Sequence, residues 1–339
     1  MERSRIYKIL WLGVMLSVLA FCLFWGREPT KKEQEILWNS PTPTVSATVP
    51  VVQVFLPSLP TQTPAPAPTL PVEEPFCLFW FSDTQVYSYK YPEVFRSMAD
   101  WAVEQAEAYG ALAVVHTGDI VDNHTYERHW TNAESAIIRL DGKLPFFCVA
   151  GNHDVGASEP NYEAYRTYGF CSRKDRSHTF RDGVCWWEAF ETQKLLLLGI
   201  GWQTGEDYLP WAEEVLNRFS DHSVVVLVHS FLTDEGELTG TGKKLEASLL
   251  REHENVRLVL CGHNDGSTQW QKTYEDGRIV HALMYNFQDD KKHGLGYLRI
   301  LLFDPVTREI DVTTYSPYLD DYNYYADASR DTFTLTDAF

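Results

Sequence analysis

Short apolar runs alternate with amphipathic segments from about residue 76 onward, and five of these runs end abruptly in polar residues. Runs of this kind are typical of buried β-strands, whereas the spacing of apolar positions between 92 and 109 predicts a helix. The five runs span 76–81, 112–115, 145–149, 224–228 and 256–260, and they lead into 82–85, 118–123, 151–154, 229–230 and 262–265. Each junction therefore places polar side chains at the end of a predicted strand.

The rest of the pattern predicts an α/β fold. Further helices are expected near 125–140, 161–168, 208–219 and 244–253, and further strands at 184–190, 195–200, 278–285, 297–303 and 310–315. Strands that alternate with helices and then give way to hairpins are typical of two mixed β-sheets packed as an α/β sandwich. We therefore expect one folded domain from residue 76 to residue 339.

The polar residues at the five junctions are expected to meet in one cleft. In open α/β sheets, ligands bind in the crevice beyond the carboxyl ends of the strands. The junctions supply carboxylates, amide groups and imidazoles, which are common ligands of divalent metal ions. The side chains expected to bind metal are Asp83, Gln85, Asp119, Asn152, His229, His263 and Asp265.

This set of ligands suits a hydrolase with two metal ions. Such a site needs one carboxylate that bridges the ions and terminal ligands on each of them. Asp119, at the end of a central strand, is the expected bridge. The expected terminal ligands are Asn152, His229 and His263 for one ion, and Asp83, Gln85 and Asp265 for the other.

Residues beside these ligands are candidates for proton transfer and substrate binding. His153 is expected to protonate the leaving group, with Asp122 fixing its tautomer and raising its basicity. His124, which directly follows the Asp119 loop, is expected to contact the substrate. The irregular segments 155–181 and 286–294 flank the site, and loops on a rigid scaffold usually carry specificity.

Two segments precede the predicted domain. Residues 9–25 form an almost unbroken apolar run behind three basic residues, which predicts a transmembrane anchor with residues 1–8 in the cytoplasm and the rest outside. Cleavage of this segment as a signal peptide and lipidation of Cys22 are the alternatives. Residues 26–75 form a Pro/Thr-rich extracytoplasmic linker, because ten of the 17 prolines lie between 40 and 75 and such segments favour extended conformations.

Charge and cysteine content restrict the possible partners. The net charge of −18 argues against a nucleic-acid partner, because no basic stripe is available to neutralise phosphates. Three cysteines fall in predicted strands, where Cys behaves as a small apolar residue. Cys171 and Cys185 bracket a polar loop and could form a disulfide bond outside the cytosol. The sequence leaves the oligomeric state open.

The order of these motifs resembles that of the calcineurin-like metallophosphoesterases. The segments Gly-Asp-Ile-Val-Asp at 118–122 and Gly-Asn-His-Asp at 151–154 are the most specific, and the resemblance extends over residues 76–265. The segment 296–317 is similar to the C-terminal strands of extracytoplasmic bacterial members. The resemblance implies a four-layer αββα sandwich with a dinuclear site, in which a hydroxide held by the two ions attacks phosphorus.

Two residues depart from the family pattern. Gln85 stands where the family has the His of Asp-x-His, and Asp265 stands where it has the last His of Gly-His-x-His. In the family both positions serve the same ion, so this ion would have an all-oxygen shell suited to Mn²⁺, Mg²⁺ or Ca²⁺. The other ion keeps two imidazoles and is expected to be Mn, Fe or Zn.

The expected function is hydrolysis of phosphate esters, either diesters or monoesters, at the outer side of the membrane. The alternative is a catalytically weak or inactive metal-binding surface protein that recognises a phosphorylated envelope component. The two differ in whether Asn152→Ala or His229→Ala removes turnover or only affects binding. The same site fits many esters, so the sequence does not name the substrate.

Overall fold

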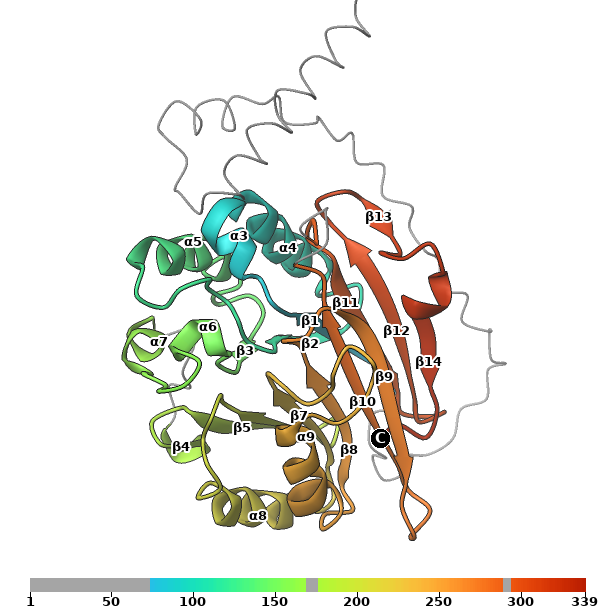
Figure 1. The fold of residues 1–339 in the computed structure, drawn as a ribbon. Helices are drawn as coiled ribbons and strands as arrows, with labels where there is room; N and C mark the ends of the chain where they lie inside the picture. Colours follow the sequence, from blue (N-terminus) through green and yellow to red (C-terminus); the bar gives the residue numbers. More distant parts are fainter. Residues whose placement is uncertain (1–73, 169–175, 289–293) are drawn as a thin grey trace, which may run out of the picture. The chain divides into compact units, whose positions relative to one another are not determined.

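The computed structural model describes residues 74–168, 176–288 and 294–339 (Figure 1). The predicted anchor at 9–25 and nearly all of the linker lie outside the described residues. Among the helices in the described ranges, none has the length and apolar character needed to cross a bilayer. The strands form two seven-stranded mixed sheets, as the sequence predicted.

The first sheet has the order β13-β12-β11-β1-β2-β3, with β14 paired to β12. β1, β2 and β3 run parallel, and β11 joins β1 on its other side in the antiparallel direction. The carboxyl ends of the three parallel strands therefore lie side by side at the same end of the sheet. The strands are β1 (Phe76–Phe81), β2 (Ala111–His116), β3 (Phe146–Cys148), β11 (Leu298–Asp304), β12 (Glu309–Ser316), β13 (Asp321–Tyr322) and β14 (Thr332–Leu335).

The second sheet has the order β4-β5-β6-β7-β8-β10-β9. Its central strands β6, β7, β8 and β10 run parallel, and antiparallel pairs complete both edges. The carboxyl ends of β7 and β8 thus lie at the same end of this sheet, as those of β1 to β3 do in the first sheet. The strands are β4 (Thr179–Phe180), β5 (Cys185–Phe190), β6 (Leu195–Ile200), β7 (Ser223–Val228), β8 (Val256–Cys261), β9 (Gly266–Thr273) and β10 (Ile279–Asn286).

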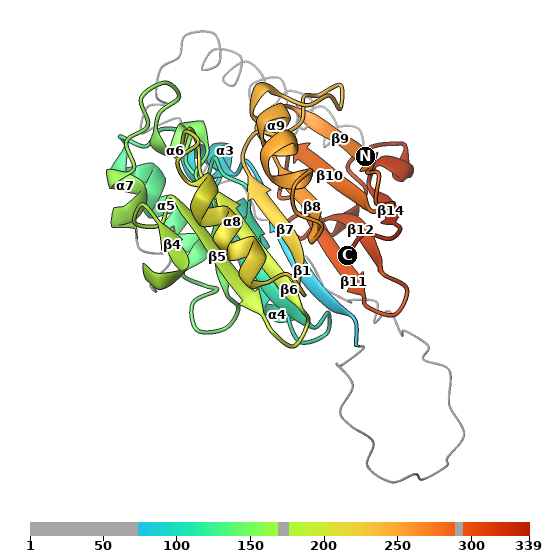
Figure 2. The ribbon, with the colours of Figure 1, turned by 90° about the horizontal axis from the view of Figure 1, so that it is seen from below.

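Helices flank the two sheets. In Figure 1, α3, α4 and α5 lie together at one end of the domain and α8 and α9 at the other, with strands between them. Figure 2 shows α8 and α9 lying over the strands of the second sheet. The α-helices are α3 (Gln85–Lys90), α4 (Pro92–Gln105), α5 (Glu127–Ile137), α6 (Asn152–Val155), α7 (Glu163–Thr167), α8 (Leu209–Arg218) and α9 (Gly240–Leu245), and α9 continues into a π-helix, η2 (Glu246–Leu250).

Strand β1 shows why its residues form an unbroken apolar run. All of them are buried, because both faces of the strand are covered. The Trp80 ring packs against Tyr285 of the second sheet, with ring centroids 4.6 Å apart. On the opposite face, Phe81 packs against Phe95 of α4 at 6.4 Å. The core between the sheets and the core beneath the helices therefore meet at this strand.

The element boundaries differ from the prediction at a few places. The helix expected over 92–109 ends at Gln105, because the chain turns into β2 through Gly110 at a φ of +59°. The helix expected over 244–253 begins at Gly240 and changes to a π-helix. Helix α3 was not predicted, and neither was β9, whose alternating exposed positions are polar.

Candidate metal centre

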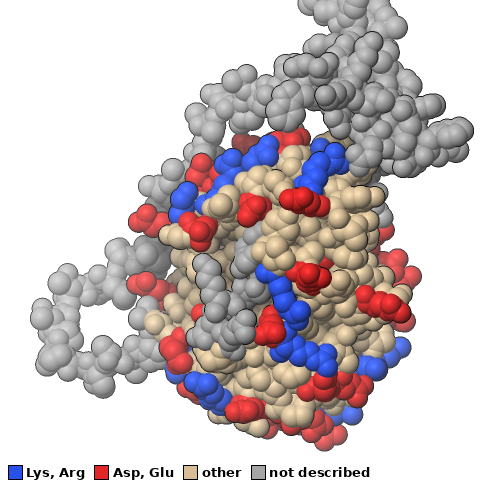
Figure 3. All heavy atoms as spheres, turned by 90° about the vertical axis from the view of Figure 1, so that its left-hand side faces the viewer, with Lys and Arg blue, Asp and Glu red and all other residues tan. Residues whose placement is uncertain are grey.

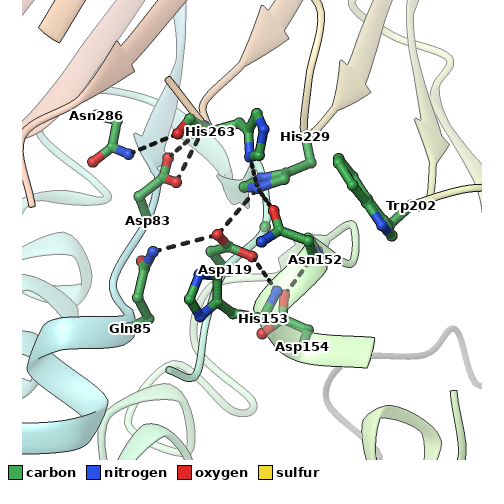
Figure 4. A network of polar contacts seen from close by, with 12 residues as sticks. Asp83, Gln85, Asp119, Asn152, His153, Asp154, Trp202, His229, His263 and Asn286 are labelled. Carbon is green, nitrogen blue, oxygen red and sulfur yellow. Dashed lines mark hydrogen bonds and ion pairs between the residues drawn. The ribbon is translucent and has the colours of Figure 1, made fainter. Parts of the chain in front are cut away.

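The ends of five strands from the two sheets bring five of the predicted ligands to one place (Figure 4). Asp83 follows β1 and Asp119 follows β2, while Asn152 begins α6 shortly after β3. From the second sheet, His229 follows β7 and His263 comes shortly after β8. The convergence of strand ends that the sequence predicted is therefore present in the fold.

Asp119, His229 and His263 form the tightest group. One ligand atom from each lies within 4.8 Å of the others, which makes the group a possible metal site among the described residues. Asp119 has a φ of 56°, a strained conformation for a residue other than glycine. Gly151 makes this conformation possible, since a Cβ atom there would collide with the Asp119 carboxylate.

The orientation of His229 fixes which of its nitrogens faces the group. Nδ1–H donates to the carbonyl oxygen of Thr117 at 2.8 Å, so Nε2 presents its lone pair to the cluster. Nε2 lies 3.1 Å from Asp119 Oδ2, 3.1 Å from Asn152 Oδ1 and 3.2 Å from His263 Nδ1. Acceptor atoms crowded in this way require a positive charge among them, either a proton or a metal ion.

The acid–base properties of the two imidazoles agree with this crowding. Burial alone would lower the pKa of His229, but the Asp119 carboxylate raises it to about 9. Burial and the charge on His229 lower the pKa of His263 to about 4. Without an ion, the cluster therefore holds a proton on His229. A metal ion would replace that proton, and the carboxylate, amide oxygen and imidazoles around it are suitable ligands.

Asp83 and Gln85 extend the cluster on the β1 side. Both Asp83 oxygens accept hydrogen bonds from the backbone N–H of His263, at 3.1 and 3.2 Å, and burial raises the Asp83 pKa to about 7. The Gln85 amide donates from Nε2 to Asp119 Oδ2 at 3.3 Å. Its Oε1 atom is buried without a hydrogen-bond partner among the residues that the structure describes. An amide oxygen without a partner, close to two carboxylates, is suited to bind a cation.

Asp265, like Asp83, is a predicted carboxylate ligand that is not part of the group formed by Asp119, His229 and His263. Its side chain is exposed, and it is not among the ligand atoms that lie within 4.8 Å of one another. The chain leaves β8 through Gly262, where a Cβ atom would collide with the Asp83 carboxylate. His263 then turns with a φ of 72°. This turn directs His263, rather than Asp265, to the cluster.

His153 lies beside the cluster with its side chain 40% exposed. Its backbone N–H donates to Asp119 Oδ1 at 2.8 Å. Its Nδ1 atom lies 2.7 Å from the backbone carbonyl of Asp122 and 3.9 Å from the Asp122 carboxylate. Burial opposes protonation, but the charge of Asp119 and the Asp122 carbonyl raise the pKa of His153. The closest contact that orients this imidazole is therefore a backbone oxygen.

Asp154 is a site residue whose role the sequence analysis missed. This fully buried carboxylate accepts hydrogen bonds from the N–H groups of Ile120 and Val121 through Oδ1, at 2.8 and 3.0 Å. Through Oδ2 it accepts from the N–H of Gly151 at 2.9 Å. It thus ties the loop after β2 to the loop after β3. Its position three residues after Gly151, the spacing of a capping box, was the available signal.

Other residues complete the edge of the site. The backbone N–H of His124 donates to the carbonyl of His153 at 3.1 Å, and its half-buried ring lies next to Gly156. Trp202, which the sequence did not single out, lies against the rings of His229 and His263 (Figure 4). Of the segments expected to select substrate, residues 169–175 and 289–293 lie outside the described residues, as does Cys171. Cys185 is a buried free thiol on β5.

Comparisons with known proteins identify relatives of this chain. An uncharacterized protein from Bacillus subtilis, YvnB, is 30% identical over 79% of this chain and 22% of its own length. A probable glycerophosphodiester phosphodiesterase, GpdQ, from Arcobacter nitrofigilis is 27% identical over 47% of this chain and 59% of its own length. The chain thus spans about a fifth of the first relative and less than two thirds of the second.

A solved structure and a family model complete the comparison. The purple acid phosphatase PPD1 from yellow lupin (Lupinus luteus) seeds is 13% identical, with a TM-score of 0.53 over 79% of this chain and 55% of that chain. This likeness concerns the fold alone. The model of the calcineurin-like phosphoesterases matches residues 78–264, which include every predicted metal ligand except Asp265. Because this match covers more than half of the sequence, the chain belongs to the calcineurin-like phosphoesterase family.

Proposed function

We propose that the domain hydrolyses phosphate esters with divalent metal ions bound around Asp119, His229 and His263. The observation that carries this proposal is the convergence of their ligand atoms within 4.8 Å, at the ends of strands from both sheets. The name of the Arcobacter relative, glycerophosphodiester phosphodiesterase, favours a diester over a monoester. Membership of the phosphoesterase family supports the same reaction class.

The residues around the cluster have separate tasks in this proposal. Ions bound there would supply positive charge for the phosphoryl oxygens and a nucleophilic water at neutral pH. Nδ1–H of His153 donates a hydrogen bond to the backbone carbonyl of Asp122, and the raised pKa of His153 favours the doubly protonated imidazole. His153 then has a second proton, on Nε2, that it can give to the leaving oxygen.

The two predicted metal sites are unequal. Asn152, His229 and His263 would hold one ion with Asp119, and this site suits Mn, Fe or Zn. Asp83 and Gln85 would hold the other with Asp119, and their oxygens suit Mn²⁺, Mg²⁺ or Ca²⁺. Because Asp265 is exposed, whereas Asp83 is buried, the oxygen-rich site should bind its ion more weakly. Weak binding at this site would favour the alternative of a slow enzyme or a metal-binding surface protein.

Turnover of metal-stripped protein tests the proposal. We would reload it separately with Mn²⁺, Mg²⁺, Ca²⁺ and Zn²⁺ and measure hydrolysis of 4-nitrophenyl mono- and diesters. We expect activity to return with Mn²⁺ or Mg²⁺ and to be lost in His229→Ala. The control is His253→Ala, which lies before β8 and therefore at the opposite end of that strand from the cluster. If the protein binds metal but shows no turnover with any of the ions, the proposed hydrolysis is wrong and the alternative of a metal-binding surface protein is supported.

The location of the domain is part of the same proposal. We place it at the outer side of the membrane, held by residues 9–25 through the linker at 26–75. The support is the sequence of these two segments, both of which lie almost entirely outside the described residues. On the face of the domain shown in Figure 3, basic and acidic side chains are interspersed. Protease treatment of intact cells should digest the domain, and protection of the domain until lysis would contradict this placement.

A further inference from the structure

A cavity of about 610 Å³ adjoins the metal centre, and two of the residues at the centre, Trp202 and His229, also line it. It lies between the loop that follows β6 and the α9–η2 helix. A phosphate group alone is far smaller than this volume. Pockets of this size hold small organic ligands. We propose that this cavity binds a polyhydroxylated alcohol carried by the phosphate ester, an inference that rests on the proposed function.

Trp202 is fixed between the cavity and the metal ligands. Its indole Nε1–H donates to the carbonyl of Ala157 at 3.1 Å, and its own carbonyl accepts from the hydroxyl of Tyr162 at 2.7 Å. The centroid of its ring lies 5.7 Å from that of His229 and 5.3 Å from that of His263. A substituent on a phosphate bound at the cluster would therefore have a flat aromatic surface close by. The carbon-bound hydrogens of a polyol pack well on such a surface.

Two residues that line the cavity and are buried overall, Thr204 and Ser230, carry hydroxyl groups. Thr204 is 5% exposed and Ser230 is 7% exposed. Neither hydroxyl oxygen makes a hydrogen bond to another described residue, so both hydroxyl groups are available to a ligand in the cavity. A ligand that can both donate and accept hydrogen bonds would satisfy them. Hydroxyl groups do both, which is why we infer a polyhydroxylated alcohol rather than an alkyl chain.

The opposite wall and the mouth of the cavity are also held in place. Ala247 and Ser248 belong to the π-helix η2, a conformation that is rare and frequent at functional sites. Glu246 anchors this helix through hydrogen bonds from Lys272 Nζ at 2.6 Å and from the Tyr274 hydroxyl at 3.1 Å. Across the cavity, Lys244 Nζ on α9 pairs with Glu206 at 3.3 Å. Since this pair contributes both charge signs, it favours a neutral, polar ligand.

Binding of two phosphonates to the full chain loaded with Mn²⁺ tests the inference without relying on turnover. Methylphosphonate can reach only the metal cluster, whereas 3,4-dihydroxybutylphosphonate adds a diol, and neither has a P–O–C bond to hydrolyse. By titration calorimetry we expect the diol compound to bind at least about tenfold more tightly. Thr204→Val should reduce this ratio about fivefold, as expected for one lost hydrogen bond. Ala247→Trp, which fills the cavity from an exposed position, should bring the ratio close to one.

Matched controls separate the cavity from general effects of substitution. Thr131→Val and Ala108→Trp change exposed residues on and near other helices, outside the cavity lining, and should leave the ratio unchanged. A wild-type ratio near one, or a ratio that Thr204→Val and Ala247→Trp leave intact, would overturn the inference. A protein that shows the predicted ratio but hydrolyses no ester would retain the alcohol pocket and lose the proposed catalytic function.

Discussion

Replacement of Asp154 should destabilise the domain and weaken metal binding together. Its carboxylate accepts three backbone hydrogen bonds, from the N–H groups of Gly151, Ile120 and Val121. In Asp154→Ala these three buried donors lose their partner. At about 1 kcal/mol for each, the free energy of unfolding should fall by about 3 kcal/mol. For a domain of this size, the melting temperature should fall by about 6 to 12 °C.

The effect on metal binding follows from what the three hydrogen bonds hold together. The two loops joined by Asp154 carry Asp119, Asn152 and His153, so their separation should lower Mn²⁺ affinity by about 10- to 100-fold. Thermal unfolding and calorimetric metal titration measure the two effects. Asp141→Ala, at an exposed position, is the control and should change neither quantity. Full metal affinity in a destabilised Asp154→Ala protein would refute the reasoning.

Three further changes have distinct expected outcomes. His229→Ala should reduce turnover at least about a hundredfold, measured with 4-nitrophenyl diesters. The reason is that it removes a proposed metal ligand that lies 3.1 Å from Asp119. Gln85→His should shift the oxygen-rich site towards zinc, measured by metal analysis after equilibration with Mn²⁺ and Zn²⁺. Burial opposes ionisation of Glu246, but Lys272 and Tyr274 hold its pKa below 4.5. Glu246→Gln should therefore lower stability in denaturation curves above pH 4.5, and this difference should vanish as the pH falls through the lowered pKa.

The fold was largely predictable because its central strands are covered on both faces. Such strands consist of nearly continuous apolar residues, so β1, β6, β7 and β8 could be located within one residue at each end. Elements whose sequences carry weaker signals were missed. β9 has mostly polar residues and only one buried side chain, so it lacks an apolar run. α3 has only six residues, and it begins at Gln85 beside the cluster.

The sequence could predict those site residues that directly follow a buried strand. Asp119, Asn152, His229 and His263 follow buried strands closely, so their positions follow from the topology. The path of a loop beyond the strand is not encoded in the same way. The turn after β8 sends His263 inward while Asp265 is exposed, and the Asp122 backbone, rather than its carboxylate, lies closest to His153. Asp154 acts through backbone donors, and the only sequence signal of this role is its capping-box spacing from Gly151.

The most direct test of the central claim is anomalous X-ray diffraction from crystals of the protein grown with Mn²⁺. We expect a strong manganese peak within bonding distance of Asp119, Asn152 Oδ1, His229 Nε2 and His263 Nδ1, and a weaker peak near Asp83 and Gln85. Absence of any peak at this cluster under saturating Mn²⁺ would contradict the assignment of a metal centre to the five strand ends.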